Sequence, residues 1–187
     1  MTQDAQPRLS PLSTAEWEDQ QRALLRGNLA RADRYLSGEP DGPPIPPILG
    51  LFARHPHIGG AWLAFSGALI ENGSLPERDR ELLILRVGHR TNSGYLLSQH
   101  RPMAEKAGLG NDELEALHDE PSAFQWSDRD LHLIRAADEL IDGYTVTDGT
   151  WVALTASFNE QQLLEVLFLV GSYVCLSMVL NSVELPS

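Results

Sequence analysis

Residues 74–109 carry the most continuous hydrophobic pattern of the chain, and they predict two helices in succession. In ELLILRV, 81–87, apolar residues fall on nearly every side of a helix, which indicates a buried helix rather than an amphipathic one. Ser74 and Glu77 have the spacing of a capping box, so we expect this helix to begin near residue 75 with Ser74 as its N-cap.

A second helix is expected after the polar break at 91–94, and it ends at Gly108, a residue type that commonly follows a helix. One face of this helix collects apolar side chains and one histidine: Leu96, Leu97, His100, Met103, Ala104 and Ala107. We therefore expect His100 to point into the core, near Glu81 at the head of the preceding helix.

Glu81 and His100 form the candidate chemical pair of this stretch. A buried carboxylate and a buried imidazole on adjacent helices can act together as a general acid/base pair. A structural interpretation competes with this one. A histidine on an apolar face is often a hydrogen-bonded core residue, and a glutamate in a first turn interacts favourably with the helix dipole.

The other patterns are helical too, and no stretch alternates as a strand would, so we predict an all-α fold. Residues 1–12 predict a flexible tail, followed by one helical domain over 13–187. The five prolines within 37–47 predict an extended connector. Further helices are predicted over 13–35, 55–73, 127–141, 150–158 and 163–180, with a short acidic one ending before Pro121.

A weak internal echo joins two of these helices. RELLILR at 80–86 is similar to RDLHLIR at 129–135, which places Asp130 opposite Glu81. The echo gives weak support to a duplicated helical unit, although two helices with similar caps would look the same. It brings no counterpart of His100, so no second active site is expected.

The last predicted helix, 163–180, is apolar enough to raise the question of a membrane span. Gly171, Ser172 and Ser177, together with the lack of basic flanks, favour instead a core helix that a partner subunit partly covers. The only cysteine, Cys175, is expected to be buried there. With no disulfide possible within the chain and no signal-peptide pattern at its start, we expect a cytoplasmic protein.

Charge is distributed unevenly along the chain. Residues 1–109 contain 12 basic and 12 acidic side chains, whereas residues 110–187 contain 2 basic and 14 acidic ones. The net charge of −12 therefore arises in the second part. Such a protein is a poor nucleic-acid binder. Arginines near the two central helices are candidates to bind a substrate carboxylate, or to pair with acidic neighbours. They are Arg78, Arg80, Arg86, Arg90 and Arg101.

No metal or organic cofactor is expected. His55 and His57 are separated by one proline and lack a further ligand at a suitable spacing. The only lysine, Lys106, lies near the end of a predicted helix, which argues against Schiff-base chemistry.

The stretch LPERDRELLILRVGHRTNSGYLLSQHRPMAEKAGL, 75–109, resembles the signature of the carboxymuconolactone decarboxylase family, which also contains the alkylhydroperoxidase D-like proteins. The resemblance extends through 53–69 and 158–186. It implies an all-helical homo-oligomer, a dimer, trimer or hexamer, that binds a small molecule between its helices.

In the peroxidase branch of this family, a glutamate is followed after eleven residues by C-x-x-C-x-x-x-H. On this chain Glu81 and His100 occupy the acid and histidine positions, while Ser93 and Leu96 occupy the cysteine positions. Peroxide reduction in that branch needs both thiols. The resemblance therefore favours the non-redox members, which act on small carboxylated or enolisable molecules without a cofactor.

The resemblance also implies a substrate site beside His100 and Glu81, the expected catalytic residues. Its candidate substrate contacts are Trp62, Phe65, Ser66, Arg86, Ser93, Tyr95, Leu96 and Leu97. Tyr95 is the weaker of these because its helical phase puts it off the His100 face. We expect decarboxylation, or a related proton transfer, on a lactone or keto acid. A peroxidase and a non-catalytic small-molecule binder or scaffold are the alternatives.

Overall fold

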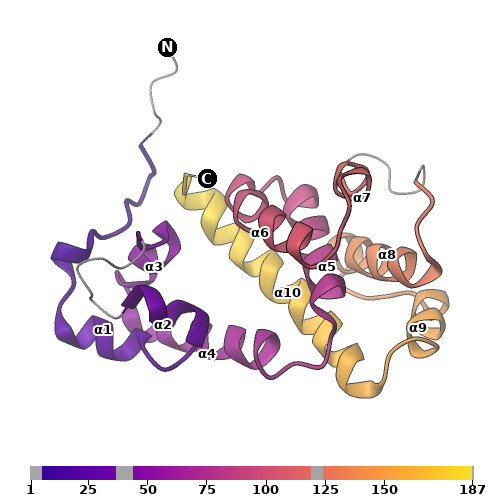
Figure 1. Ribbon diagram of the computed structural model, residues 1–187, viewed down its shortest axis with the longest axis horizontal. Coiled ribbons are helices and arrows are strands. Elements are labelled where there is room, and N and C mark those ends of the chain that lie inside the picture. Colours follow the sequence, from indigo (N-terminus) through magenta and orange to yellow (C-terminus); the bar gives the residue numbers. More distant parts are fainter. Residues whose placement is uncertain (1–5, 37–43, 119–123, 187) are drawn as a thin grey trace, which may run out of the picture. The chain divides into compact units, whose positions relative to one another are not determined.

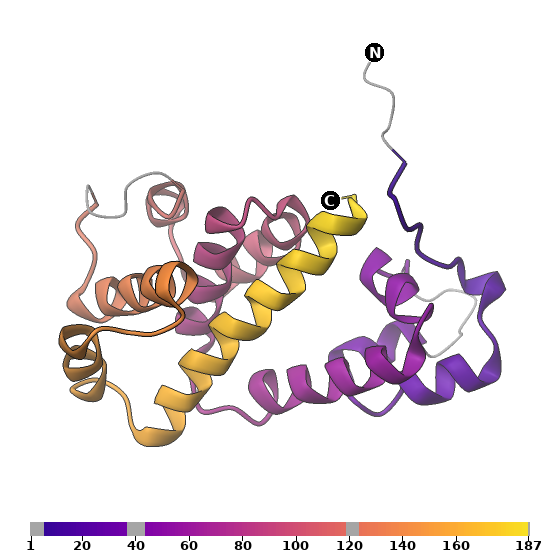
Figure 2. The same ribbon diagram turned by 180° about the vertical axis from the view of Figure 1, so that it is seen from behind.

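The computed structural model describes residues 6–36, 44–118 and 124–186 of the 187-residue chain. Within these residues every regular element is a helix, in agreement with the predicted all-α fold (Figures 1 and 2). A 3-10 turn, Thr14–Glu16, precedes α1 Asp19–Leu25, α2 Ala30–Leu36, α3 Pro47–Phe52, α4 Pro56–Ile70, α5 Glu77–Arg90, α6 Gly94–Lys106, α7 Asn111–Ala116, α8 Asp128–Gly143, α9 Asp148–Thr155 and α10 Glu160–Val183. Where the sequence predicts one domain, the contacts divide the chain into two compact units, one up to Gly73 with Val183–Pro186 and the other Ser74–Ser182.

The first unit packs α1 to α4 around a small apolar core. Its buried members are Trp17, Leu25, Leu29, Ala32, Leu36, Leu49, Ala53 and Leu63. Gly60 lets α4 approach α1 closely, because a Cβ at this position would lie 2.3 Å from the carbonyl oxygen of Leu24. The adjacent glycines Gly59 and Gly60 thus mark the place where α4 packs closely against its neighbours.

The prediction of one helix over 13–35 is wrong. The capping box of Ser13 and Glu16 is present, but it opens only the 3-10 turn, and α1 and α2 follow as separate helices. Gly27 separates them because it adopts a left-handed φ of 75°. Its N–H donates to Oδ1 of Asp33 at 2.9 Å, which ties the turn to α2.

Two predicted connecting segments are only partly described. In the predicted tail, the N–H groups of Arg8 and Leu12 donate to the carbonyl oxygens of Val183 and Gly50, at 2.9 Å and 3.0 Å. Most of the proline-rich connector, residues 37–43, lies outside the described residues, as does Pro121.

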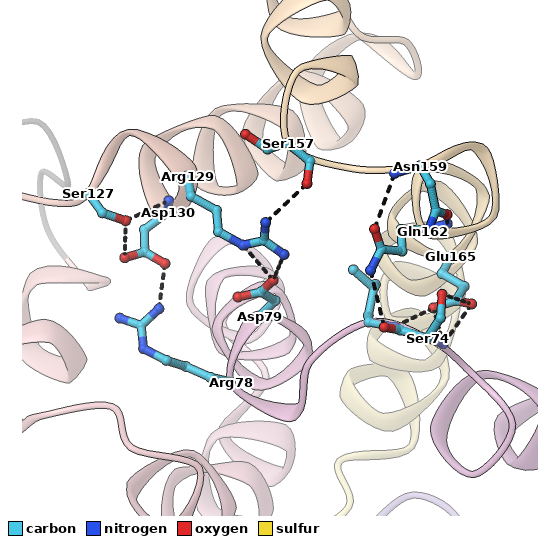
Figure 3. Close-up of polar contacts among 11 residues, drawn as sticks. Ser74, Arg78, Asp79, Ser127, Arg129, Asp130, Ser157, Asn159, Gln162 and Glu165 are labelled. Carbon is cyan, nitrogen blue, oxygen red and sulfur yellow. Dashed lines mark hydrogen bonds and ion pairs between the residues drawn. The ribbon is translucent and has the colours of Figure 1, made fainter.

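In the second unit, α5 is surrounded by its neighbours. Every residue from Asp79 to Gly88 is buried, as the continuous hydrophobic pattern predicts. The helix begins at Glu77 with Pro76 as its N-cap, so the prediction of Ser74 as the cap is wrong. Ser74 is engaged elsewhere: its N–H and its hydroxyl both donate to the carboxylate of Glu165 in α10 (Figure 3).

Ion pairs hold α5 parallel to α8. Arg78, Arg86 and Arg90 bind Asp130, Asp138 and Asp142, and in each pair the two residues are 52 apart in sequence. A constant offset requires the two helices to run in the same direction. Arg129 of α8 reciprocates by donating to Oδ2 of Asp79 at 2.6 Å and 2.9 Å (Figure 3). The two helices joined by the sequence echo are thus packed neighbours.

The predicted limits of the other helices in this unit are largely confirmed. Gly108, with φ of 100°, follows α6. The hydroxyl of Ser127 accepts the N–H of Asp130 at the start of α8. Asn159 and Gln162 exchange hydrogen bonds at the start of α10.

The helix α10 is the longest of the described elements, with 24 residues. By length and composition it could cross a membrane, with a mean hydropathy of 2.2 over a window that is 44% buried. Its exposed apolar residues include Phe168 and Met178. Cys175 is exposed as well, so the prediction that it is buried is wrong. It lies on the same side of the helix as Phe168 and Met178, which are seven residues before it and three after it.

Glu165 is the polar anchor between α10 and the start of α5. Although it is only 8% exposed, its carboxylate accepts N–H bonds from Ser74 and Leu75 and a bond from the side chain of Gln161. Burial alone would raise the pKa of Glu165, but these hydrogen bonds outweigh burial and the pKa is lowered.

We expect Glu165→Gln to lower the free energy of unfolding by about 1–3 kcal/mol at neutral pH, because the amide keeps only one of the two oxygens that accept N–H bonds from Ser74 and Leu75. A carboxylate whose pKa is lowered by folding stabilises the protein above its unfolded pKa, and this contribution is lost as pH falls through the folded value. The difference between wild type and variant should therefore shrink below about pH 4. Urea denaturation across this pH range measures it. Glu160→Gln, at an exposed position of the same helix, is the control, and equal stability of wild type and Glu165→Gln would contradict the assignment.

Arg86 provides a second test of the fold. It is 5% exposed, and we expect Arg86→Gln to cost about 3 kcal/mol, because the substitution leaves Asp138 with Arg90 alone and removes the side-chain donor to the carbonyl of Leu117. Arg101→Gln removes the same charge from an exposed pair and should cost about 1 kcal/mol or less. Similar urea midpoints for the two variants would show that the α5–α8 pairing contributes no more than a surface ion pair.

Candidate active site

Glu81 and His100 meet in the interior of the second unit. Nδ1 of His100, in α6, lies 2.7 Å from Oε2 of Glu81, in α5. Glu81 is 1% exposed and His100 is 8% exposed, so the contact is shielded from bulk water. The prediction that both side chains point into the core, next to each other, is confirmed. Their catalytic role stays a prediction.

The contact determines how a neutral imidazole of His100 presents its two nitrogens. A carboxylate only accepts hydrogen bonds, so Nδ1 is the donor and Nε2 carries the lone pair. Nε2 has no hydrogen bond to any part of the chain that the structure describes. The ring of Tyr173, in α10, packs edge-on against the imidazole at 5.3 Å between centroids and limits its rotation. The imidazole is thus oriented by Glu81, and its Nε2 is left free of hydrogen bonds within the described chain.

Four of the five candidate arginines are engaged with acidic side chains. Arg78 binds Glu113 and Asp130, Arg86 and Arg90 share Asp138, Arg90 also binds Asp142, and Arg101 binds Glu105 and Glu115. All three guanidinium nitrogens of Arg86 are bonded, two to Asp138 and one to the carbonyl oxygen of Leu117. The structure therefore places Arg86, a predicted substrate contact, in a buried structural network.

The fifth arginine differs from the others. Arg80 is 7% exposed, and its guanidinium group forms no hydrogen bond within the described chain, although its Nη2 lies 3.8 Å from Oε1 of Glu77. Its Nε lies 4.0 Å from Oε1 of Glu81, so Glu81 stands between Arg80 and His100. The sequence names Arg80 only as one of five arginines, because most partners of the other four lie far away in the chain.

The remaining predicted contacts of the second unit lie near the start of α6. Ser93, Tyr95 and Leu96 are buried, and the hydroxyl of Ser93 has no hydrogen-bond partner among the described residues. Leu97 packs against Gly88 of α5, where an added Cβ would lie 2.9 Å from a methyl group of Leu97. Both cysteine positions of the peroxidase motif are therefore buried and lack sulfur.

Trp62, Phe65 and Ser66 lie on α4, in the first unit. The rings of Trp62 and Phe65 are 6.3 Å apart, and Phe65 is 37% exposed. Contact of these three residues with a substrate stays a prediction. His55 has a structural role, since its Nδ1 accepts the N–H of Ile58 at the N-cap of α4.

Two further observations bear on metals and on the other histidines. The described residues contain no group of three or more His, Cys, Asp or Glu side chains that could hold a metal ion. His89, near the end of α5, packs edge-on against His118 at 5.2 Å. Burial and the neighbouring His118 lower the pKa of His89 to about 4, so its imidazole is neutral at physiological pH.

Comparison with known proteins shows which fold the chain has and which family its central part matches. Residues 56–139, which include Glu81 and His100, match the model of the Carboxymuconolactone decarboxylase family. A search of curated proteins gives no match.

Three solved structures are similar to this chain. A peroxidase-related protein from Ralstonia eutropha JMP134, described as an alkylhydroperoxidase AhpD core, is 14% identical with a TM-score of 0.77, covering 96% of this chain and 91% of its own. A peroxidase-related protein from Silicibacter sp. TM1040 is 13% identical with a TM-score of 0.76, and the match covers 98% of this chain and 93% of that protein. A protein of unknown function from Agrobacterium tumefaciens is 14% identical with a TM-score of 0.67, and the match covers 73% of this chain and 94% of that protein. Residues 56–139 therefore match the carboxymuconolactone decarboxylase family, and the chain has an alkylhydroperoxidase D-like helical fold without the C-x-x-C pair.

Proposed function

We propose that this protein is a cofactor-independent acid/base enzyme that acts on a small carboxylated or enolisable substrate, such as a lactone or a keto acid. The observation that carries the proposal is the 2.7 Å contact between Glu81 and His100, with both side chains buried. A histidine oriented in this way is suited to move a proton to or from carbon.

In a decarboxylation, the bond between the carboxylate and the α-carbon breaks and its electron pair moves onto the neighbouring carbonyl oxygen. Carbon dioxide leaves, and an enolate remains. The imidazolium of His100 then donates the proton on Nε2 to the α-carbon, and the neutral ring takes up a proton from water for the next turnover. Glu81 stabilises the imidazolium and keeps Nε2 directed toward the substrate.

The reverse proton movement serves the related reactions. Neutral His100 removes a proton from a carbon next to a carbonyl group, which gives an enolate that can isomerise or close a ring. Leu96 and Leu97 supply apolar surface that keeps water from competing for the enolate. Ser93 and Tyr95 are the further substrate contacts of this proposal.

A peroxidase is the alternative that the similar structures raise, since two of them are described as peroxidase-related. The thiol route requires an attacking and a resolving cysteine. Ser93 and Leu96 supply neither, and Cys175 is the only cysteine of the chain. A non-catalytic binder is the third possibility, in which Glu81 and His100 form a structural hydrogen bond only.

We further propose that the protein acts in the cytoplasm as a homo-oligomer. The exposed apolar residues Leu164, Phe168 and Met178 of α10 support this assembly, since large exposed apolar surfaces commonly mark protein contacts.

The proton transfer can be tested before the net reaction is known. A panel of β-keto acids and carboxylated lactones is incubated with the protein in D2O, and loss of the α-proton signal is followed by NMR together with release of carbon dioxide. We expect wild type to accelerate exchange or decarboxylation of one panel member. His100→Asn should lower the rate about 10²–10⁴-fold, because it removes the proton carrier.

Glu81→Gln keeps the side-chain shape but cannot stabilise the imidazolium, so its rate should fall between those of wild type and His100→Asn. Arg101→Gln, next to His100 in sequence but on an exposed ion pair, is the control and should keep the wild-type rate. If wild type and His100→Asn exchange every panel member at the same rate while both remain folded, the acid/base assignment is wrong.

A further inference from the structure

We propose that Arg80 binds a carboxylate group of the substrate, beside the Glu81–His100 pair. The direct observation is a guanidinium group that is nearly buried and has no hydrogen bond within the described chain. The inference rests on the proposed function for the role of His100. The binding of an anion at Arg80 can be tested separately.

The guanidinium group of Arg80 has two carboxylates at ion-pair distance but forms no hydrogen bond within the described chain. Its side chain is 8% exposed, and its Nε is buried without a partner. The nearest carboxylate oxygens are Oε1 of Glu77, 3.8 Å from Nη2, and Oε1 of Glu81, 4.0 Å from Nε. Both distances exceed the roughly 2.7–3.2 Å of a hydrogen bond to nitrogen.

Arg86 shows what a structural arginine looks like on the same helix. It is buried to a similar extent, at 5% exposed, and each of its three guanidinium nitrogens bonds an oxygen at 2.7–2.9 Å. A buried charged donor without a partner is unfavourable, and natural structures rarely keep one without a reason. An incoming ligand that supplies two oxygens gives such a reason for Arg80.

Neutralising Glu81 is the competing explanation for Arg80. The geometry argues against it as the whole role, because Glu81 directs Oε2 to His100 and leaves Oε1 at 4.0 Å from Arg80. An arginine retained as the counter-ion of one carboxylate would be expected to donate to it at hydrogen-bond distance, as Arg86 does to Asp138.

The chemistry of the guanidinium group indicates the class of ligand. Its planar fork matches the two oxygens of a carboxylate, which it binds by two parallel hydrogen bonds. Because Glu81 lies between Arg80 and His100, a carboxylate held by Arg80 would be attached to a molecule within reach of the imidazole. We therefore infer an anionic substrate.

The ion pair with Arg80 also indicates whether the bound carboxylate is the one that leaves as carbon dioxide. Loss of carbon dioxide moves negative charge away from the carboxylate, so an ion pair there would stabilise the substrate more than the transition state. The carboxylate on Arg80 thus stays on the molecule, and the reaction takes place at another group. If the reaction is a decarboxylation, the substrate carries two carboxylates.

The test uses the full-length protein and a matched pair of probes, 5-oxotetrahydrofuran-2-carboxylate and its uncharged methyl ester. The Nε–Hε signal of Arg80, assigned with the Arg80→Lys variant, and the ring signals of His100 are followed by NMR during titration. We expect the carboxylate to shift both signals and the ester to leave the Arg80 signal in place.

The variants then measure how much Arg80 contributes. Arg80→Gln should weaken binding of the carboxylate probe about tenfold or more, as the loss of a charge-assisted pair implies. Arg80→Lys keeps the positive charge but lacks the planar fork of donors, so its affinity for the carboxylate probe should lie between those of wild type and Arg80→Gln. Arg101→Gln, the control for net charge, should bind as wild type does. Thermal melting confirms that each variant is folded. If Arg80→Gln does not fold, the binding affinity of Arg80→Lys alone decides the test.

Two results would overturn the inference: a carboxylate probe that never shifts the Arg80 signal, or equal binding by wild type and the Arg80 variants. These failures are distinguishable from failure of the proposed function. If the exchange rate depends on His100 but the Arg80 variants keep the wild-type KM, only the anion site is wrong. If the carboxylate shifts Arg80 while the exchange rate is independent of His100, the anion site stands and the acid/base function falls.

Discussion

The second unit depends on how charged side chains are accommodated inside α5. A helix that is buried all round would normally be apolar, yet α5 contains buried Asp79, Glu81 and Arg86. Each of them takes its partner from another helix: Arg129 and Asp138 belong to α8, and His100 belongs to α6. Because a buried charge without a partner is costly, these pairs allow only one arrangement of the three helices. Apolar contacts supply most of the driving force, and the charges select the register.

The register is shared by more than two helices. Partners 52 residues apart keep α8 parallel to α5, and α10 is tied to the start and end of α5 through Glu165 to Ser74 and through Ser177 to Thr91. A shift of α8 by one turn would separate Arg78, Arg86 and Arg90 from the aspartates that lie 52 residues after them. The similar segments of the two helices are 49 residues apart in sequence, whereas the paired arginines and aspartates are 52 residues apart. The difference is about one helical turn, so the residues that are similar in sequence are not the residues that pair.

Local signals in the sequence were sufficient for most helix limits and for the Glu81–His100 contact, because caps and helical phase depend on residues a few positions apart. Long-range partners were not predictable in this way. Ser74 has the spacing of a cap, but it bonds Glu165, 91 residues away. Five arginines looked equivalent in sequence, and only the positions of their distant aspartates and glutamates distinguish Arg80 from the other four. The exposure of Cys175 depends likewise on which side of α10 the neighbouring helices cover.

Ser93 and Leu96 stand in place of the two thiols, so they change the conditions for the proposed proton-transfer pair as well as removing the thiol route. A buried leucine beside His100 lowers the local polarity, and electrostatic interactions strengthen as water is excluded. The Glu81–His100 contact and an ion pair at Arg80 would both gain from that environment, whereas a thiolate would lose stability in it. The same substitution that rules out the thiol route therefore favours chemistry in which a fixed carboxylate, an imidazole and a bound anion act together.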